Sequence, residues 1–126
     1  MTNQKEFLTN LLQNNPDAVI VGSLGTISYD LNEIGHQNKI LVKGAMGCVV
    51  GLGVGYAMGS SKQVIVVIGD GSFLMKMGIL SSILKYDLKN LRIIIMDNHK
   101  YKSCGEQATN FSAIKHLIPL EIYEVE

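Results

Sequence analysis

Two apolar runs of strand length, separated by a helix-length segment, constrain this chain more than any other feature. The run from Val64 to Ile68 is β-branched throughout, and a second apolar run extends from Leu91 to Met96. Continuous apolar runs of this length are typical of parallel strands that are buried on both faces. Residues 73–86 between them have helical character, so the pattern predicts a βαβ unit. We therefore expect an α/β fold, doubly wound around a mainly parallel sheet.

The remaining segments extend this alternation along all 126 residues, which we expect to form one domain. The patterns predict further strands at residues 18–21, 39–42 and 120–125, and helices at residues 2–14, 27–34, 45–58 and 111–118. The helix at 45–58 carries four glycines and no charge, although each glycine costs about 1 kcal/mol relative to alanine. We expect it to be covered on every side, either by its own sheet alone or, as we favour, by a second chain as well.

Composition excludes several classes of function. Eleven basic and 11 acidic residues give zero net charge, and no basic patch indicates nucleic-acid binding. The amino-terminal region resembles no signal peptide, and no apolar run reaches the roughly 20 residues of a membrane span. The two cysteines have no metal-type spacing and fit a reducing compartment, so we expect a cytoplasmic protein without membrane contact.

Oxygen-bearing side chains follow both strands of the βαβ unit. Asp70 comes directly after the first strand, and Asn98 follows the second. Ligands of open parallel sheets bind beyond the carboxyl ends of the strands, and such oxygens suit Mg²⁺. Gly71 would let a ligand approach the backbone, and the following helix would favour a phosphate. Taken singly, Asp70 could be a helix cap and Asn98 a turn residue, but the pair at this spacing predicts a metal site.

Gly69-Asp70-Gly71, followed 28 positions beyond Asp70 by Asn98, resembles the motif of thiamin-diphosphate-dependent enzymes, with Asp97 in place of the first Asn of the family's pair. The resemblance implies the diphosphate-binding domain of the family, with Mg²⁺ and thiamin diphosphate as cofactors. It implies a metal held by the Asp70 carboxylate, the Asn98 amide oxygen and the Lys100 carbonyl. Two segments would contact the diphosphate: the turn with Gly69, Gly71 and Ser72, and a loop with Ser23, Gly25 and Thr26.

The segment Gly44-Ala45-Met46-Gly47 resembles another cofactor segment of this family. The resemblance implies that the Gly44 carbonyl accepts a hydrogen bond from the pyrimidine amino group. It also implies that Met46, after the small Ala45, wedges between the two cofactor rings. Core packing is the alternative role for Met46, because it is the commoner fate of a methionine.

The loop after Asn98 resembles the pattern Asn-Gly-x-His-x-Ser-x-Gly-Gly-Gln-Pro-Thr of phosphonopyruvate and sulfopyruvate decarboxylases, and the overall resemblance covers residues 7–118. The positions that match are Asn98, Ser103, Gly105, Gln107 and Thr109. The positions that depart, and leave the substrate open, are His99, Tyr101, Glu106 and Ala108.

In this family a glutamate from a pyrimidine-binding domain activates the cofactor, and 126 residues hold only the diphosphate-binding half, short at its C-terminus. The resemblance therefore implies no catalytic residue in this chain and a partner subunit that carries the glutamate, in a hetero-oligomer of α2β2 type or larger. The expected reaction decarboxylates a small 2-oxoacid to CO2 and an aldehyde. Alternatives are a carboligase subunit, a non-catalytic cofactor- or partner-binding module, and a flavodoxin-like nucleotide-binding protein, which the missing Walker lysine and dinucleotide glycine pattern disfavour.

Overall fold

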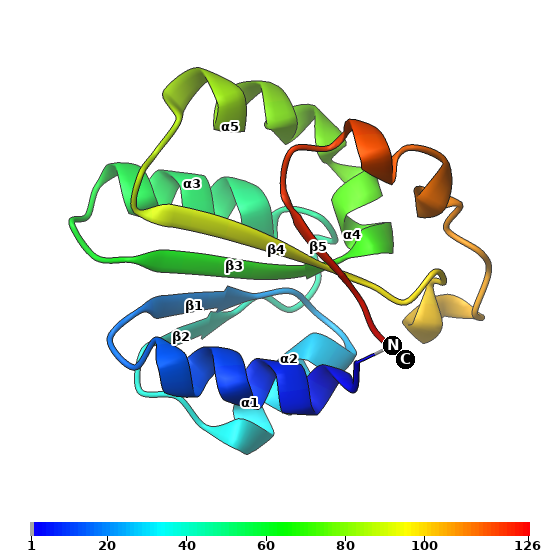
Figure 1. Cartoon of the computed structure of the whole chain (residues 1–126), viewed down its shortest axis with the longest axis horizontal. Helices are drawn as coiled ribbons and strands as arrows, with labels where there is room; N and C mark the ends of the chain where they lie inside the picture. Colours follow the sequence, from blue (N-terminus) through cyan, green and yellow to red (C-terminus); the bar gives the residue numbers. More distant parts are fainter. Residues whose placement is uncertain (1) are drawn as a thin grey trace.

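The computed structural model describes residues 2–126 and contains one five-stranded sheet (Figure 1). Its strands run in the order β2-β1-β3-β4-β5, and every neighbouring pair is parallel. The expectation of a mainly parallel, doubly wound α/β fold is therefore confirmed. The strands are β1 (Val19–Gly22), β2 (Lys39–Leu41), β3 (Val64–Gly69), β4 (Leu91–Asp97) and β5 (Glu121–Glu124).

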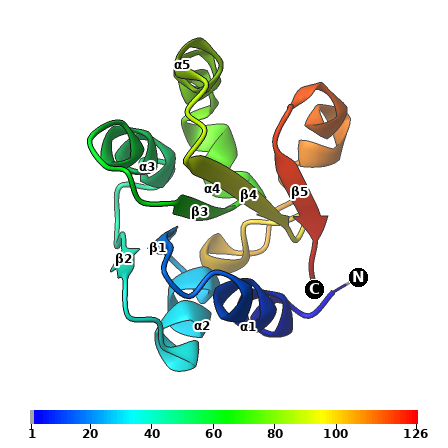
Figure 2. The same cartoon turned by 60° about the vertical axis from the view of Figure 1, so that its left-hand side comes forward.

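Helices cover both faces of the sheet, as Figure 2 shows. One face carries α1 (Gln4–Asn14) and α2 (Thr26–Ile34). The other face carries α3 (Val49–Met58), α4 (Asp70–Met75) and α5 (Leu80–Tyr86). Short 3-10 turns complete the chain: η1 (Met77–Ile79), η2 (Lys102–Cys104), η3 (Phe111–Ala113) and η4 (Lys115–Leu117). No helix among residues 2–126 combines the length and the apolar character that a membrane crossing requires.

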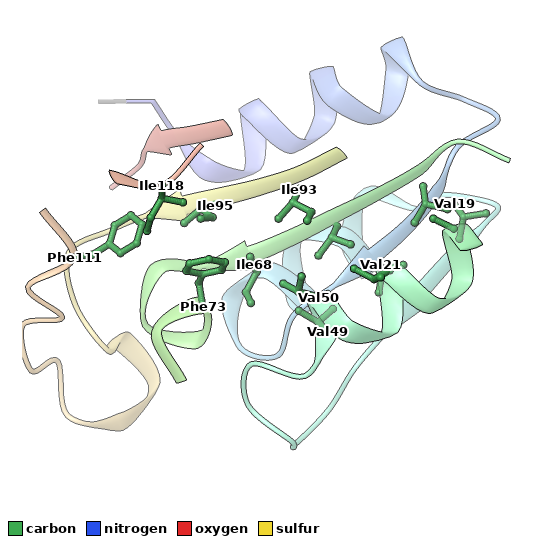
Figure 3. Close-up of a cluster of buried hydrophobic side chains, with 14 residues drawn as sticks. Val19, Val21, Val49, Val50, Ile68, Phe73, Ile93, Ile95, Phe111 and Ile118 are labelled. Carbon is green, nitrogen blue, oxygen red and sulfur yellow. The ribbon is translucent and has the colours of Figure 1, made fainter. Parts of the chain in front are cut away.

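Strand β3 lies at the centre of the sheet and contributes to both halves of the core. Val66 and Ile68 face the side of α3 and α4, whereas Ile65 and Val67 face α1 and α2. This two-sided burial explains the continuous apolar run, since neither face of the strand meets water. On the α4 side, Phe73 meets the edge of a second ring from Phe111, with centroids 6.4 Å apart (Figure 3). The loop beyond β4 is thereby anchored to the core next to the end of β3.

The predicted helix at 45–58 is wrong in its first turn, because α3 begins only at Val49. Gly44, Ala45 and Gly47 have φ angles of +71°, +47° and +88°. These left-handed conformations cannot belong to a right-handed helix. The segment is instead a tight turn that leads into the helix.

Two further helices also differ from expectation. The helix predicted at 73–86 begins earlier, at Asp70, and breaks at Lys76, so that α4 and α5 are separate and joined by η1. The helix predicted at 111–118 is replaced by the 3-10 turns η3 and η4. Phe73 and Phe111 of these segments pack against each other in the core, and such tertiary contacts can override a weak local helix preference.

Glycines let α3 lie close against the sheet, as the sequence predicts. A Cβ atom on Gly53 would collide with the side chain of Val66, whereas Gly55 has open space around it. The outer face of the helix exposes Leu52 (43%) and Met58 (53%). Within this chain the helix is therefore covered on one side only, and the second chain on its outer face stays a prediction.

Strand β5 closes one edge of the sheet and brings the two ends of the chain together. Arg92 of β4 donates two hydrogen bonds, of 2.9 and 2.7 Å, to the Glu121 carboxylate of β5. The Thr2 backbone N–H donates to the Glu124 carbonyl, and the Glu126 N–H donates to the Thr2 carbonyl. The predicted strand at 120–125 is confirmed in slightly shorter form.

Candidate functional site

The strand order reverses between β1 and β3, and a pocket lies beyond the carboxyl ends of these strands. In doubly wound folds this switch point is the usual place for a ligand, because the loops on its two sides diverge there. Of the residues that sequence predicts for the site, all except Ser23, Gly44 and Ala45 line the pocket: Gly25, Thr26, Met46, Gly69, Asp70, Gly71, Ser72, Asn98 and Lys100. Asp70 and Asn98 thus lie at the same pocket, as expected.

Asp70 is the only acidic residue among residues 2–126 that lines the pocket, and just 1% of it is exposed. Its carboxylate accepts a 2.5 Å hydrogen bond from the Thr109 hydroxyl. Burial raises the pKa of Asp70 above its ordinary value and nearby Asp97 adds to this, while hydrogen bonds from Thr109 and the Asn98 backbone lower it. Among residues 2–126 no cation lies within ion-pair distance of this carboxylate. A buried carboxylate without a counter-charge suits a bound cation.

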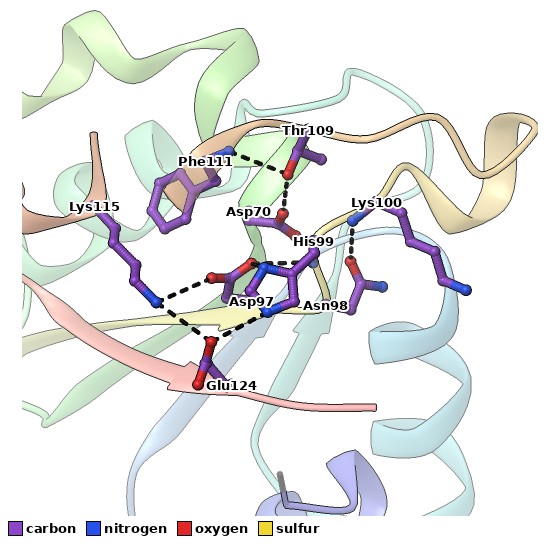
Figure 4. A network of polar contacts seen from close by, with 9 residues as sticks. All are labelled: Asp70, Asp97, Asn98, His99, Lys100, Thr109, Phe111, Lys115 and Glu124. Atoms are coloured by element: carbon purple, nitrogen blue, oxygen red, sulfur yellow. Dashed lines mark hydrogen bonds and ion pairs between the residues drawn. The ribbon is translucent and has the colours of Figure 1, made fainter. Parts of the chain in front are cut away.

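Asn98 is held at the pocket by its own backbone. Gly69 of β3 pairs with Met96 of β4, so Asn98 follows β4 close to the level at which Asp70 follows β3. The Asn98 side-chain oxygen accepts a 3.2 Å hydrogen bond from the Lys100 N–H, an Asx turn that fixes the amide (Figure 4). One lone pair of that oxygen stays free, so the carboxylate and the amide can offer oxygens to one ion.

The first turn of α4 presents backbone to the pocket. A Cβ atom on Gly71 would lie 2.5 Å from a ring carbon of Tyr101, so the tyrosine ring rests directly on the glycine. Ser72 also lines the pocket, and its hydroxyl accepts a 3.4 Å hydrogen bond from Ser23. Ser23 is therefore a buried support behind Ser72 and does not line the pocket.

A second hollow adjoins the first, since Leu24, Gly25 and Ser103 line both. The pocket around Asp70 measures about 70 Å³, whereas the second measures about 560 Å³ and is lined by Gly44. Sites for small organic ligands usually measure roughly 300–1,000 Å³. The pair of hollows therefore offers a narrow polar end at Asp70 and a wider end near Gly44, with Met46 at the narrow end.

The loop from Asn98 to Thr109 keeps its turns despite its departures from the family pattern. His99 and Glu106 stand where that pattern has glycine, and their φ angles are +68° and +62°. Glycine adopts such angles without strain, whereas other residues rarely do. The Glu106 N–H donates to the Tyr101 carbonyl, and the Tyr101 N–H donates to the Gln107 carbonyl. These bonds hold the loop over the pocket.

Sequence reasoning assigned no role to several polar residues of this region. Thr109, which bonds Asp70, was one of the matched loop positions, and its match was the signal for a role. The ion-pair cluster of Asp97, His99 and Glu124 gave no signal, because Glu124 reaches it only through the pairing of β5 with β4.

Comparisons with known proteins identify the family of the chain. Residues 21–118 match the family model described as thiamine pyrophosphate enzyme, C-terminal TPP binding domain. The sulfopyruvate decarboxylase subunit beta of Methanococcus maripaludis is 35% identical over 106 residues, which are 83% of this chain and 57% of that protein. The phosphonopyruvate decarboxylase of Streptomyces hygroscopicus is 35% identical over 79% of this chain and 25% of that protein. The resemblance found in the sequence is thereby confirmed.

A solved structure shows the same fold. A 2-oxoglutarate:ferredoxin oxidoreductase from Magnetococcus marinus matches with a TM-score of 0.58 and 15% identity, over 82% of this chain and 36% of that one. The chain spans about half the length of the beta subunits it matches. The family match covers most of the chain and includes the Gly69–Gly71 turn and Asn98. The chain therefore belongs to the family of C-terminal TPP-binding domains of thiamine pyrophosphate enzymes.

Proposed function

We propose that this chain is the diphosphate- and magnesium-binding half of a thiamin-diphosphate-dependent 2-oxoacid decarboxylase. The observation that carries the proposal is the buried Asp70 carboxylate, which shares a pocket with Asn98 and has no ion-pair partner among residues 2–126. Relatives named sulfopyruvate and phosphonopyruvate decarboxylase support a 2-oxoacid with an anionic tail as the substrate.

The residues present fit the cofactor. Asp70, the Asn98 amide oxygen and the Lys100 carbonyl would hold Mg²⁺, which prefers oxygen ligands. The backbone at Gly69, Gly71 and Ser72, with Gly25 and Thr26 opposite, would hold the diphosphate, and Ser23 would support Ser72 from behind. Gly44, Ala45 and Met46 would hold the ring end near the wider hollow. When bound, thiamin diphosphate supplies the electron sink for cleavage of the carboxylate–carbonyl bond.

Residues of this chain orient the proposed metal ligands and determine the charge of the metal site. Thr109 fixes the Asp70 carboxylate by its short hydrogen bond, and the Asx turn fixes Asn98. Because burial raises the pKa of Asp70, cation binding releases a proton from the fraction of molecules in which the carboxyl is neutral. Metal-dependent binding therefore strengthens as pH rises through that pKa. Tyr101 covers Gly71, so the loop must withdraw before a diphosphate can reach the turn.

A partner chain would complete the site. Asp70 is the only acidic side chain that lines the pocket among residues 2–126, so the activating glutamate would come from a pyrimidine-binding subunit. The name subunit beta of the relatives supports a hetero-oligomer, which we propose to be of α2β2 type or larger. Both cysteines are free and exposed, which fits a cytoplasmic location.

A non-catalytic cofactor- or partner-binding module is the second candidate. The narrowness of the pocket, closed by Tyr101, favours it. A carboligase subunit would use the same metal site and differ in what happens after CO2 leaves.

Calorimetry and turnover assays separate these functions. We expect the chain to bind thiamin diphosphate only with Mg²⁺, and more tightly with a subunit that carries the pyrimidine-binding domain. The chain alone should not decarboxylate sulfopyruvate or phosphonopyruvate, and the complex should release CO2 from one of them. Binding without turnover in the complex would favour the module, and robust turnover by the isolated chain would contradict a partner-borne glutamate.

A further inference from the structure

We propose that Asp97, His99 and Glu124 form a second divalent metal site, for an ion of the zinc type, where β5 meets the end of β4. None of the three residues lines the pocket that holds Asp70 and Asn98. The site is therefore distinct from the proposed cofactor site but adjacent to it, because Asp97 neighbours Asp70. The inference goes beyond the proposed function. Figure 4 shows the three side chains converging from β4, the loop after it and β5.

The distances between the side chains suit a shared ion. Each of the three residues offers one ligand atom, and these atoms all lie within 4.8 Å of one another. The His99 ring lies between the two carboxylates, with Nδ1 at 3.3 Å from Asp97 Oδ1 and Nε2 at 3.2 Å from Glu124 Oε1. Zinc binds carboxylate oxygen and imidazole nitrogen at about 2.0–2.2 Å. One ring nitrogen of His99 would bind the ion, so the carboxylate at the other nitrogen must leave it and rotate toward the ion.

Asp97 provides an independent indication of a missing ligand. The residue is fully buried, and Oδ1 accepts a 3.0 Å hydrogen bond from the His99 backbone. Its second oxygen, Oδ2, is buried without any hydrogen-bond partner among the described residues. A buried charged oxygen without a hydrogen bond is costly, and a coordinated cation would supply the missing contact.

Lys115 places a positive charge near two of the proposed ligands, Asp97 and Glu124. Its ammonium lies 3.3 Å from Glu124 Oε1 but 3.9 Å from Asp97 Oδ2, too far for a hydrogen bond. The lysine side chain is 34% exposed, so it can swing into solvent when an ion enters. A divalent ion would contact both carboxylates directly, which the ammonium does not achieve in its present position.

The ligand set selects the kind of ion. Two carboxylates with one imidazole suit zinc and neighbouring transition metals, whereas Mg²⁺ disfavours an imidazole ligand. His99 and Glu124 are 40% and 50% exposed, so an ion can enter and water can complete its coordination. Bound there, the ion would join β4 to β5 and stabilise the closing edge of the sheet.

Zinc titration of the 126-residue chain tests the proposal. Because Cys48 and Cys104 are free and exposed, all measurements use a Cys48→Ser/Cys104→Ser background. We expect one equivalent of Zn²⁺ to bind in calorimetry and to raise the Tm. Loss of an outer partner of a metal ligand typically costs 10–100-fold in affinity, so His99→Ala, which removes a direct ligand, should weaken binding by more than about 100-fold. His116→Ala is the matched control, because it removes an exposed histidine outside the cluster.

Three further variants keep the test decisive. Lys115→Met removes the competing ammonium and should tighten zinc binding severalfold, and Glu124→Gln should weaken it even if His99→Ala fails to fold. Asp70→Ala should still bind one equivalent of zinc while it loses cofactor binding, which separates this site from the proposed function. Unchanged zinc affinity in the Glu124→Gln variant, weaker zinc binding in Lys115→Met, or no zinc binding at all would overturn the proposal.

Discussion

The pocket at the switch point has one buried wall and one exposed wall. The buried wall is the turn from Gly69 to Ser72, in which Asp70 and Ser72 are 1% and 7% exposed. The exposed wall is the loop from Lys100 to Cys104, which is attached through the hydrogen bonds of Tyr101 and the bridge between Lys100 and Ala108. The fold therefore fixes the Asp70 carboxylate on one side of the site. A ligand can reach the site only from the other side, where the wall is exposed.

The largest expected effect is on cofactor affinity, and it distinguishes the roles of the two walls. Asp70→Ala should lower Mg²⁺-dependent affinity for thiamin diphosphate by more than about 100-fold, because it removes a buried charged ligand. Lys100→Ala should leave the affinity nearly unchanged, since only the backbone carbonyl of this residue is proposed as a ligand. Its side chain makes an exposed ion pair with Glu106, which is worth about 0–1 kcal/mol.

Calorimetry with and without Mg²⁺ measures both affinities in the comparison. Wild-type binding by Asp70→Ala would show that the buried wall does not hold the metal. An equally large loss in Lys100→Ala would show that the side chains of the exposed wall matter as much.

Substitutions at two glycines of one turn test whether that turn supports the buried wall. Gly44 and Gly47 both have positive φ, so alanine at either position should cost about 1 kcal/mol in strain. A Cβ atom on Gly47 would also lie 2.7 Å from the Ser72 carbonyl oxygen, whereas Gly44 has nothing within 4 Å. We expect Gly47→Ala to lower the free energy of unfolding by about 2–3 kcal/mol and Gly44→Ala by about 1 kcal/mol. Urea unfolding measures both, and equal losses would contradict the proposed contact.

Backbone strain just after the exposed wall, in the same loop, predicts a smaller effect of opposite sign. Glu106 has a φ of +62°, and a non-glycine residue in that region costs about 1–2 kcal/mol. Glu106→Gly should therefore raise the free energy of unfolding by up to about 1 kcal/mol, after the loss of its exposed ion pair and the entropy of glycine are subtracted. The neighbouring Gly105→Ala, at φ +102°, should lower the same quantity in urea unfolding. A destabilised Glu106→Gly variant would show that the loop depends on its side-chain contacts.

The smallest expected effect concerns the charge of Asp70 in the cofactor-free chain. Because burial raises its pKa, the stabilisation from proton binding is complete below the ordinary pKa of 3.8 and is lost as pH rises through the raised value. Asp70→Asn should therefore raise the Tm at pH 7 by a few degrees. The difference from the parent chain should disappear as the pH falls below that pKa. Thermal unfolding without Mg²⁺ measures it, and a lower Tm for the variant would contradict a costly buried charge.

The strands were the predictable part of this fold. All five lie within a residue or two of the expected segments. The apolar runs of β1, β3 and β4 are buried, as their pattern requires, whereas the edge strands β2 and β5 are only half-buried or exposed. The presence of Asp70 and Asn98 at one pocket followed from the same logic, because each residue directly follows one of two neighbouring parallel strands. Helix limits were less predictable: the positive φ angles at 44–47 and the break at Lys76 depend on contacts that local sequence does not encode.

The polar surroundings of the site could not be predicted in the same way. Thr109 reaches Asp70 across 39 positions of sequence, and Glu124 reaches His99 only after β5 has joined the sheet. Neither contact leaves a periodic signal in the sequence, because the first depends on loop conformation and the second on the pairing of an edge strand. Expectations that rested on the resemblance, such as Gly44 and Met46 beside the cofactor rings, stay predictions.

The pairing of the two chain ends has a practical consequence for handling the protein. Thr2 pairs with Val125 and bonds Glu126, so both ends leave the molecule at the same corner (Figure 1). A short linker could join them, and new ends could be opened at residues 59–63, at the opposite end of the strands from the pocket. A histidine tag on either end would emerge near Glu124, so it must be removed before any zinc titration.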